Sequence, residues 1–271
     1  TNVFSENIMS VILGISLDHT SYLGTTIREI ALEKSGIMKK GCPVFSAVKA
    51  QDAIEVIEKR AGELGCRIYT SKGGANIISS TAESTVFEYK EKQITLSSGA
   101  GYQVKNALKV LSSLEALKDR GIGVSDKAIP DAFALFKRPA RFEVFSKDPY
   151  VIFDGGHNPE CAEALTEDIK RIFPDKKLDL IVGVMADKDV LGICSILCPI
   201  TNKVYTVKPQ NPRAMDDKAL AEIFGTLGIN ATPCGNFKNA LKKWQENGRD
   251  DLLCVGSLYS YQEFKDEFSK G

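Results

Sequence analysis

The sequence predicts an α/β protein in two parts. An alternation of strand and helix patterns runs through the first half, stops at residues 137–143 and then starts again. The length of 271 residues is long for one domain and suits two. Hydrophobic residues make up 43% of the chain, which is enough apolar material for two cores. We therefore expect one domain at residues 1–137 and a second domain at residues 138–271.

The first half alternates short apolar runs with helical patterns. Its first run, residues 10–16, is continuously apolar, which is typical of a strand covered on both faces. Thr26 and Glu29 have the spacing of a capping box, and Gly36 is placed to end the helix that they begin. The other elements expected here are strands at 43–48 and 66–70 with a helix at 54–64 between them, short antiparallel strands within 75–98, and helices at 104–114 and 125–136.

The segment KRPARFE, residues 137–143, interrupts this pattern. A proline and a cluster of charges separate two helices from a new strand, as expected of a domain linker. Beyond it the alternation returns, which predicts a small Rossmann-like α/β domain with a mainly parallel sheet. Its expected elements are strands at 150–154, 178–184, 203–207 and 251–256, helices from Pro159, after Asp187, from Asp216 and from Phe237, and a last helix to the terminus.

Composition excludes several classes of protein. Lysine and arginine balance aspartate and glutamate at 35 each, so there is no electrostatic reason to expect nucleic acid or an anionic membrane as a partner. We expect neither a membrane span nor a signal peptide, because no apolar run has the required length or pattern. Seven singly spread cysteines favour a reducing cytoplasm over a disulfide framework. Cys194 and Cys198 lack the further ligands of a metal site, so buried, inert thiols are expected.

Three polar clusters follow predicted strands: DHT at 18–20, DGGHN at 154–158 and DKD at 187–189. In open α/β sheets, ligands collect at the carboxyl ends of the strands. The chain has two histidines, His19 and His157, and both fall in these clusters. A functional role is therefore favoured for each. The alternative is that both are turn histidines that cap backbone groups.

Lys34 follows the apolar face of the helix that begins near Thr26. Ile27, Ile30 and Ala31 define that face, and position 34 continues it at i+7. A lysine there must extend its amine to solvent or find a partner, and the first is the simpler explanation. The alternative is a chemical role, because a desolvated lysine is easily neutralised and modified.

Several stretches of the chain occur in the order of a known family. They resemble the folylpolyglutamate synthase/dihydrofolate synthase family of the Mur ligase superfamily, and together they span almost the whole chain. DHT with EKSG, followed by DGGHNP, is a specific combination. The implied fold is part of a Mur-ligase-type central ATP-binding domain at 1–137 and a C-terminal glutamate-ligase domain at 138–271. The stretches are LDHTSYLGTTIREIALEKSGIMKKGCPV, YQVKNALKVLSSL, RPARFE, FDGGHNPECAEAL, GVMADKD, PQNPRAMD and GSLY.

The resemblance implies an ATP-dependent ligase that adds L-glutamate to the carboxylate of a folate or a dihydropteroate. The acid takes the γ-phosphoryl group of ATP to give an acyl phosphate, and the amino group of glutamate displaces phosphate. Magnesium offsets the charge on the phosphates as they transfer. The implied roles are magnesium ligation for His19, a catalytic carbamate for Lys34, adenine contact for Gln103 and Asn106, nucleotide contact for Arg141 and Asp154, and glutamate binding for His157 and Ser257, with His157 also catalytic.

The chain departs from the family's pattern at its start. In the family, a glycine-rich P-loop precedes these motifs, yet no G-x-x-x-x-G-K-[ST] occurs in the 271 residues. Thr1 matches the family just after its GG-R-x-D-A segment, so we expect the first strands and the P-loop to be missing. A lone His19 is a poor magnesium site, because magnesium prefers oxygen ligands. We therefore expect weak or absent binding of ATP and Mg²⁺, an inactive fragment and an unmodified Lys34.

Loss of the first strands would also expose apolar parts of a sheet around residues 1–20. We expect the fragment to self-associate through that surface and the full-length protein to be a monomer. Two functional alternatives stay open. One is a degenerate, non-catalytic Mur-ligase-like protein, which the upstream reading frame would reveal. The other is a Mur-type ligase with a different acid substrate.

Overall fold

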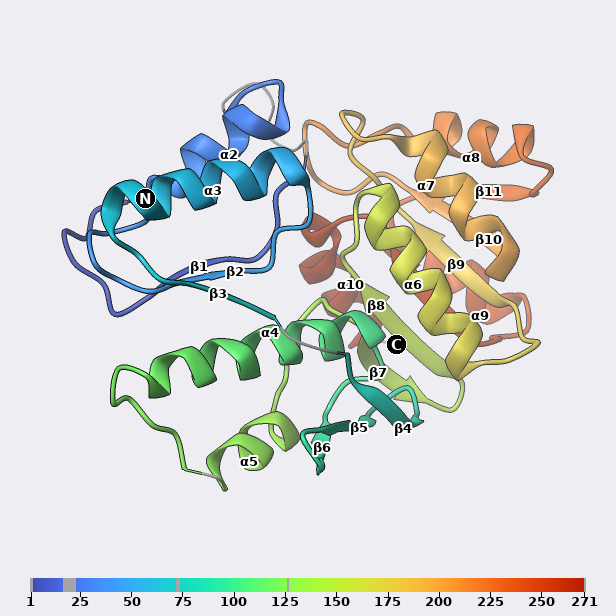
Figure 1. Ribbon diagram of the computed structural model, residues 1–271. Helices are drawn as coiled ribbons and strands as arrows, with labels where there is room; N and C mark the ends of the chain where they lie inside the picture. The colour runs from blue at the N-terminus through green and yellow to red at the C-terminus, as the bar shows by residue number, and fades with distance from the viewer. Residues whose placement is uncertain (1, 17–22, 72–73, 126, 271) are drawn as a thin grey trace. The chain divides into compact units, whose positions relative to one another are not determined.

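The structure is a computed structural model that describes residues 2–16, 23–71, 74–125 and 127–270 (Figure 1). The chain divides into two compact units. Both units contain strands and helices, so the predicted α/β class is confirmed. Unit 1 comprises Thr1–Asn76, Tyr89–Lys92 and Gln103–Asp131, and unit 2 comprises Ile77–Glu88, Gln93–Tyr102 and Ala132–Gly271.

A three-stranded parallel sheet in the order β1-β2-β3 begins unit 1. The first strand is shorter than the apolar run predicted at 10–16. Two helices connect the strands. The second packs on a small apolar core that includes Ile12, Val44 and Ile57, and the first packs against the second through Ala31 and Ala53. The elements are β1 (Ser10–Ile12), α2 (Ile27–Ser35), β2 (Val44–Ser46), α3 (Gln51–Leu64) and β3 (Ile68–Thr70).

Helix α2 begins at the predicted capping box. The Thr26 hydroxyl accepts a hydrogen bond from the Glu29 N–H at 3.2 Å, and the Glu29 carboxylate accepts one from the Thr26 N–H at 3.1 Å. Backbone N–H groups of Thr25 and Thr26 lower the pKa of Glu29, because they stabilise its charged form. The helix ends at Gly36, as predicted.

Three short strands and two helices follow in the chain. The strands form a sheet in the order β4-β5-β6. Lys90 and Glu91 make the two-residue turn between the last two strands, with φ of 49° and 62°, and only antiparallel neighbours can be joined so tightly. The elements are β4 (Asn76–Ser80), β5 (Thr85–Tyr89), β6 (Lys92–Leu96), α4 (Gly101–Lys118) and α5 (Ala128–Ala134).

The main sheet of unit 2 has six strands in the order β11-β10-β9-β12-β8-β7. All neighbours are parallel except β7 and β8, so the predicted mainly parallel sheet is confirmed. Two strands, β7 and β11, were not predicted. Strand β11 contains Pro233 and lies at an edge, where a missing N–H is tolerated. The strands are β7 (Glu143–Lys147), β8 (Tyr150–Asp154), β9 (Leu178–Val182), β10 (Thr201–Val207), β11 (Ala231–Gly235) and β12 (Leu252–Val255).

Helices cover both faces of this sheet (Figure 1). One apolar core lies between the sheet and α6 (Pro159–Ile172), α7 (Val190–Leu197) and α8 (Asp217–Thr226). The other lies against α9 (Phe237–Glu246) and α10 (Tyr261–Phe268). Successive strand residues alternate between the two cores, as Ile152 and Phe153 show. Strands buried on both faces explain the continuous apolar runs in the sequence.

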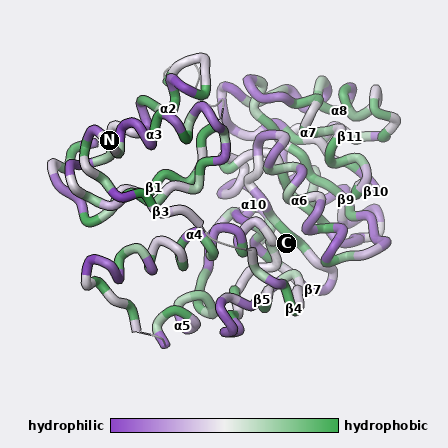
Figure 2. The backbone as a smooth tube through the Cα atoms, viewed as in Figure 1, coloured by the Kyte–Doolittle hydropathy of each residue, from purple (hydrophilic) through white to green (hydrophobic). Residues whose placement is uncertain are grey.

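Apolar side chains are exposed near the start of the chain, in the region where exposure was expected. Val3 is 82% exposed and Phe4 73% exposed, and Val11 and Leu13 are also exposed. Figure 2 shows hydrophobic and hydrophilic residues alternating along the chain. No helix among the described residues is both long and apolar enough to span a membrane. Self-association and cytoplasmic localisation stay predictions.

Candidate functional site

Three parallel strands of unit 2 end at one edge of the sheet and bring two of the predicted clusters together. Strand β12 lies between β8 and β9, and Val255 is in register with Asp154 on one side and Val182 on the other. The chain leaves these strands through the segments 154–158, 256–259 and 183–189. Arg213, from the segment between β10 and α8, contacts Asp187 and Tyr259 of these segments. We call Asp154, His157, Asp187, Arg213 and Ser257 the carboxyl-edge site.

Glycines allow these segments to approach one another closely. A Cβ atom on Gly155 would lie 2.2 Å from Leu258 Cδ2. Gly256 has φ of +120°, and a Cβ there would lie 2.6 Å from the Gly183 carbonyl oxygen. A side chain at position 256 is therefore incompatible with this edge of the sheet, and one at position 155 would require Leu258 to move.

Asp154 is buried, with 2% of its surface exposed. Its Oδ2 accepts hydrogen bonds from the Tyr102 hydroxyl at 2.6 Å and the Phe142 N–H at 2.9 Å, and its Oδ1 accepts one from the Gly156 N–H at 2.7 Å. Burial raises the pKa of Asp154, while these donors and the Arg141 guanidinium act in the opposite direction. The carboxylate is thus held inside the unit.

Arg141 lies between two residues in the left-handed region. Ala140 has φ of 60° and Phe142 has φ of 48°, and each such non-glycine conformation costs roughly 1–3 kcal/mol. The backbone of each of these two residues is hydrogen-bonded to a carboxylate. The Ala140 N–H donates to Glu143 Oε2 at 2.8 Å, and the Phe142 N–H donates to Asp154 Oδ2. The predicted linker is therefore a fixed loop, with Arg141 half-buried on it.

His157 and Ser257, for which the resemblance implies glutamate binding, follow the neighbouring strands β8 and β12. His157 is half-buried, and its Nδ1 lies 3.2 Å from the Gly155 carbonyl oxygen. Ser257 is 2% exposed, and its hydroxyl accepts a hydrogen bond from the Tyr259 N–H at 3.1 Å. His157 thus makes a local backbone contact, which is also what the alternative of a turn histidine expects.

Arg213 adds a cation that was not predicted. Its guanidinium lies 3.6 Å from the Asp187 carboxylate and 3.2 Å from the Tyr259 hydroxyl. Asp187 also pairs with Lys188 at 3.7 Å, while Asp189 caps helix α7 by accepting from the Gly192 N–H at 2.9 Å. Arg213 stands in the stretch PQNPRAMD, yet a single arginine in a loop gave no signal of its own.

The candidates of unit 1 lie on α2 and α4. Gln103 is 5% exposed, and its Oε1 accepts a hydrogen bond from Asn106 Nδ2 at 3.2 Å, so the two predicted adenine contacts adjoin. Lys34 Nζ donates to the Gly14 carbonyl oxygen at 3.2 Å. His19, the predicted magnesium ligand, lies outside the described residues.

The described residues contain no group of three or more histidine, cysteine, aspartate or glutamate side chains placed to hold a metal ion. Burial raises the pKa of Cys194 to about 12, so its thiol stays protonated at neutral pH, as expected of an inert cysteine.

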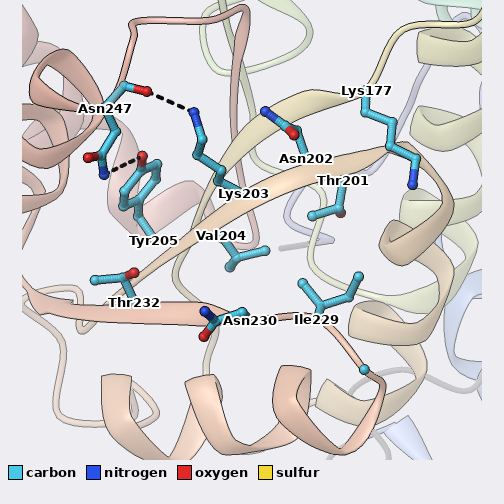
Figure 3. Close-up of a pocket in the computed structure, with 11 residues that line it drawn as sticks. Lys177, Thr201, Asn202, Lys203, Val204, Tyr205, Ile229, Asn230, Thr232 and Asn247 are labelled. Atoms are coloured by element: carbon cyan, nitrogen blue, oxygen red, sulfur yellow. Dashed lines mark hydrogen bonds between the residues drawn. The ribbon is translucent and has the colours of Figure 1, made fainter.

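A cavity of about 430 Å³ lies elsewhere in unit 2, beside the amino-terminal part of β10 (Figure 3). Lys203 lines it but donates to the Asn247 carbonyl oxygen at 2.8 Å and pairs with Asp250 at 3.3 Å. None of the five residues of the carboxyl-edge site lines this cavity.

Comparisons with known proteins agree with the predicted fold. Residues 140–258 match the family model described as Mur ligase, glutamate ligase domain. The dihydrofolate synthase/folylpolyglutamate synthase of Bacillus subtilis (strain 168) is 31% identical over 276 residues, which cover 98% of this chain and 63% of that relative.

Solved structures give the same result. Mycobacterium tuberculosis folylpolyglutamate synthase, complexed with ADP and AMPPCP, is 25% identical with a TM-score of 0.85, and the match covers 100% of this chain and 65% of that one. E. coli FolC in complex with DHPP and ADP is 27% identical with a TM-score of 0.80, over 99% and 63% of the two chains. The chain therefore spans less than two thirds of the length of these relatives.

Proposed function

We propose that this chain, whose residues 140–258 belong to the Mur ligase glutamate ligase domain family, is part of an ATP-dependent ligase that joins L-glutamate to a folate-type acid. The observation that carries the proposal is the carboxyl-edge site. It lies at the carboxyl ends of three adjacent parallel strands, which is where ligands bind in sheets of this kind.

The charges of the carboxyl-edge site suit an amino acid as ligand. A guanidinium can bind a carboxylate through two hydrogen bonds, and Arg213 presents one at this edge. Asp187, 3.6 Å from Arg213, would attract the ammonium group of the same ligand. An imidazole can accept a proton near neutral pH, so His157 would take the proton that the amine must lose before it attacks. Ser257 would add a hydroxyl beside it.

Each unit, taken by itself, offers residues whose chemistry suits a nucleotide. In unit 2, Arg141 offers a half-buried guanidinium to the phosphates. In unit 1, Gln103 and Asn106 form a joined pair of amides, which could donate to and accept from an adenine edge. In unit 1, Lys34 would act in catalysis through a carbamate, as the family resemblance implies. ATP would supply the phosphoryl group that activates the acid, and the amine of glutamate would then displace phosphate.

We also propose that the 271 residues alone do not complete the reaction, because they contain no P-loop sequence to hold the β- and γ-phosphates. The test measures phosphate release in the presence of ATP, Mg²⁺ and L-glutamate. It is run separately with dihydropteroate, tetrahydrofolate and a cell-wall precursor as the acid substrate. Glutamate-dependent hydrolysis by this chain alone would contradict the proposed inactivity. Turnover of the cell-wall precursor by the full-length protein would contradict the folate-type acid.

Glutamate binding tests the site without requiring turnover. Titration of the chain with L-glutamate, followed by NMR chemical shifts, should perturb signals of the segments 154–158 and 256–259. Arg213→Ala should abolish these changes, whereas Asn230→Ala, in the cavity of Figure 3, should leave them intact. Binding that Asn230→Ala removes and Arg213→Ala leaves would place the ligand in that cavity and overturn the proposal.

A further inference from the structure

We infer that Tyr102 is a positioning residue: through Asp154 it fixes the backbone around Arg141 and so sets where the Arg141 guanidinium points. All three residues belong to unit 2. The inference about the backbone stands on the geometry of that unit alone. Its consequence for a nucleotide rests on the proposed function.

The chain of contacts starts at the first turn of helix α4. The Gly101 N–H donates to Asp168 Oδ1 at 2.8 Å, which fixes the start of the helix within unit 2. From the next residue, the Tyr102 hydroxyl donates to Asp154 Oδ2 at 2.6 Å. The same oxygen accepts the Phe142 N–H at 2.9 Å. One carboxylate oxygen therefore joins the tyrosine to the loop that carries Arg141.

The loop around Arg141 is anchored on both sides. The side chain of Ala140 packs in the core under α9 and α10, and the side chain of Phe142 packs in the opposite core under α6 and α7. The Gly155 N–H donates to the Ala140 carbonyl oxygen at 2.9 Å. With the residues on either side buried in different cores, only Arg141 of the three keeps a side chain that can reach solvent.

The left-handed conformation of Phe142 depends on a bond to Asp154, and Asp154 depends on its donors. A buried carboxylate without partners is costly, and Tyr102 supplies one of the three hydrogen bonds that Asp154 accepts. Burial also raises the pKa of Tyr102, so its hydroxyl keeps the proton that it donates.

The carboxylate of Asp154 is 2% exposed, and it accepts three hydrogen bonds from unit 2. These contacts assign Asp154 a role in holding the Arg141 loop. The nucleotide contact that the family resemblance implies for Asp154 stays a prediction.

The experiment measures opening of the loop through tryptic cleavage of the Arg141–Phe142 bond under native conditions, followed by mass spectrometry. Cleavage after Lys242, in helix α9, reports general unfolding of the same unit. Tyr102→Phe removes only the hydroxyl. It should raise the ratio of the cleavage rate after Arg141 to the cleavage rate after Lys242 by roughly tenfold, as expected for loss of a hydrogen bond to a charged group. Tyr150→Phe is the matched control, because Tyr150 packs on the same core and its hydroxyl has no hydrogen bond within the described residues.

A double variant tests whether Tyr102 acts through Asp154. Asp154→Asn should also raise the ratio, and adding Tyr102→Phe to it should change nothing further. Three outcomes would each overturn the inference. They are an unchanged cleavage ratio in Tyr102→Phe, equal acceleration of cleavage after Arg141 and after Lys242, and full additivity of the two substitutions in the double variant.

Nucleotide binding separates this inference from the proposed function. If the chain binds ADP in calorimetry, Tyr102→Phe should weaken binding several-fold and Tyr150→Phe should not. Wild-type affinity in Tyr102→Phe would overturn the consequence for the nucleotide. If the wild-type chain shows no ADP binding, the proposed nucleotide role of Arg141 fails in this chain, and the cleavage ratio still decides whether Tyr102 positions the loop.

Discussion

Lys34 donates a hydrogen bond to the carbonyl oxygen of Gly14, with 3.2 Å between the nitrogen and the oxygen. The helical pattern left two explanations for this lysine, extension to solvent or a partner, and the structure shows a partner at an exposed position, which agrees with both. Gly14 follows strand β1, so the amine of Lys34 lies beside the end of a strand, where a catalytic group is expected in an α/β sheet.

We predict that Lys34 carries no carbamate in the isolated chain. A carbamate would place an anion against the Gly14 carbonyl oxygen and would remove the ammonium that now donates to it. The measurement is carbon NMR of the protein in ¹³C-enriched bicarbonate, with Lys34→Arg as the control because it cannot form the adduct. A carbamate signal that disappears in Lys34→Arg would show that the modification forms without the rest of a ligase.

We predict that Asp179→Asn makes stability less dependent on pH. Asp179 is fully buried, and burial raises its pKa in the folded chain, although Lys203 and Asn202 oppose the shift. As pH rises above about 4, the unfolded chain loses this proton first, so the folded chain holds more protons and the free energy of unfolding falls. The stabilising contribution is thus complete below the unfolded pKa and is lost as pH rises through the folded pKa.

Urea unfolding between about pH 4 and pH 7 checks this, with Trp244 fluorescence as the probe. Trp244 is the only tryptophan of the chain and is fully buried in unit 2. The stability of Asp179→Asn relative to the wild type should increase across this range. Parallel curves for the two proteins would show that Asp179 ionises equally in the folded and unfolded states.

Local patterns predicted the fold well where the cause of structure is local. The capping box of Thr26 and Glu29 follows from its spacing, and the apolar run at 150–154 marked the strand that Asp154 ends. Strand β11 was missed because Pro233 hides an edge strand from a pattern search.

The inner contacts of the candidate site could not be predicted in this way. Tyr102 and Asp154 are 52 residues apart in sequence, and no spacing rule links a residue on a helix to one at the end of a strand. The sequence identified Asp154 as important but not the direction of its carboxylate, because that direction is set by which donors the folded chain places around it. Arg213 was missed for a related reason, since its partners Asp187 and Tyr259 come from two other segments of the chain.

We predict that Gly256→Ala destabilises unit 2, by about 2 kcal/mol or more, because the substitution combines an unfavourable φ with a close backbone contact. The added Cβ would lie 2.6 Å from the Gly183 carbonyl oxygen. Gly225→Ala is the matched control: Gly225 lies within helix α8, and a Cβ there meets nothing within 4 Å. Alanine should stabilise this second position by about 0.5–1 kcal/mol. Urea unfolding followed by Trp244 fluorescence measures both, and equal effects of the two variants would contradict the close approach of β12 and β9 at this edge.

We predict that Phe264→Ala lowers the free energy of unfolding of unit 2 by about 3–5 kcal/mol. Phe264 is fully buried and lies within 5.2–6.2 Å, between ring centroids, of Phe145, Phe153, Phe237 and Phe268. Truncation would leave a cavity among rigid rings that cannot close over it. Phe4→Ala is the matched control, because Phe4 is 73% exposed and its loss should change stability by less than about 0.5 kcal/mol. If Phe4→Ala proved as damaging as Phe264→Ala, the exposed apolar residues near the start of the chain would have to be covered in solution, as self-association through that surface would require.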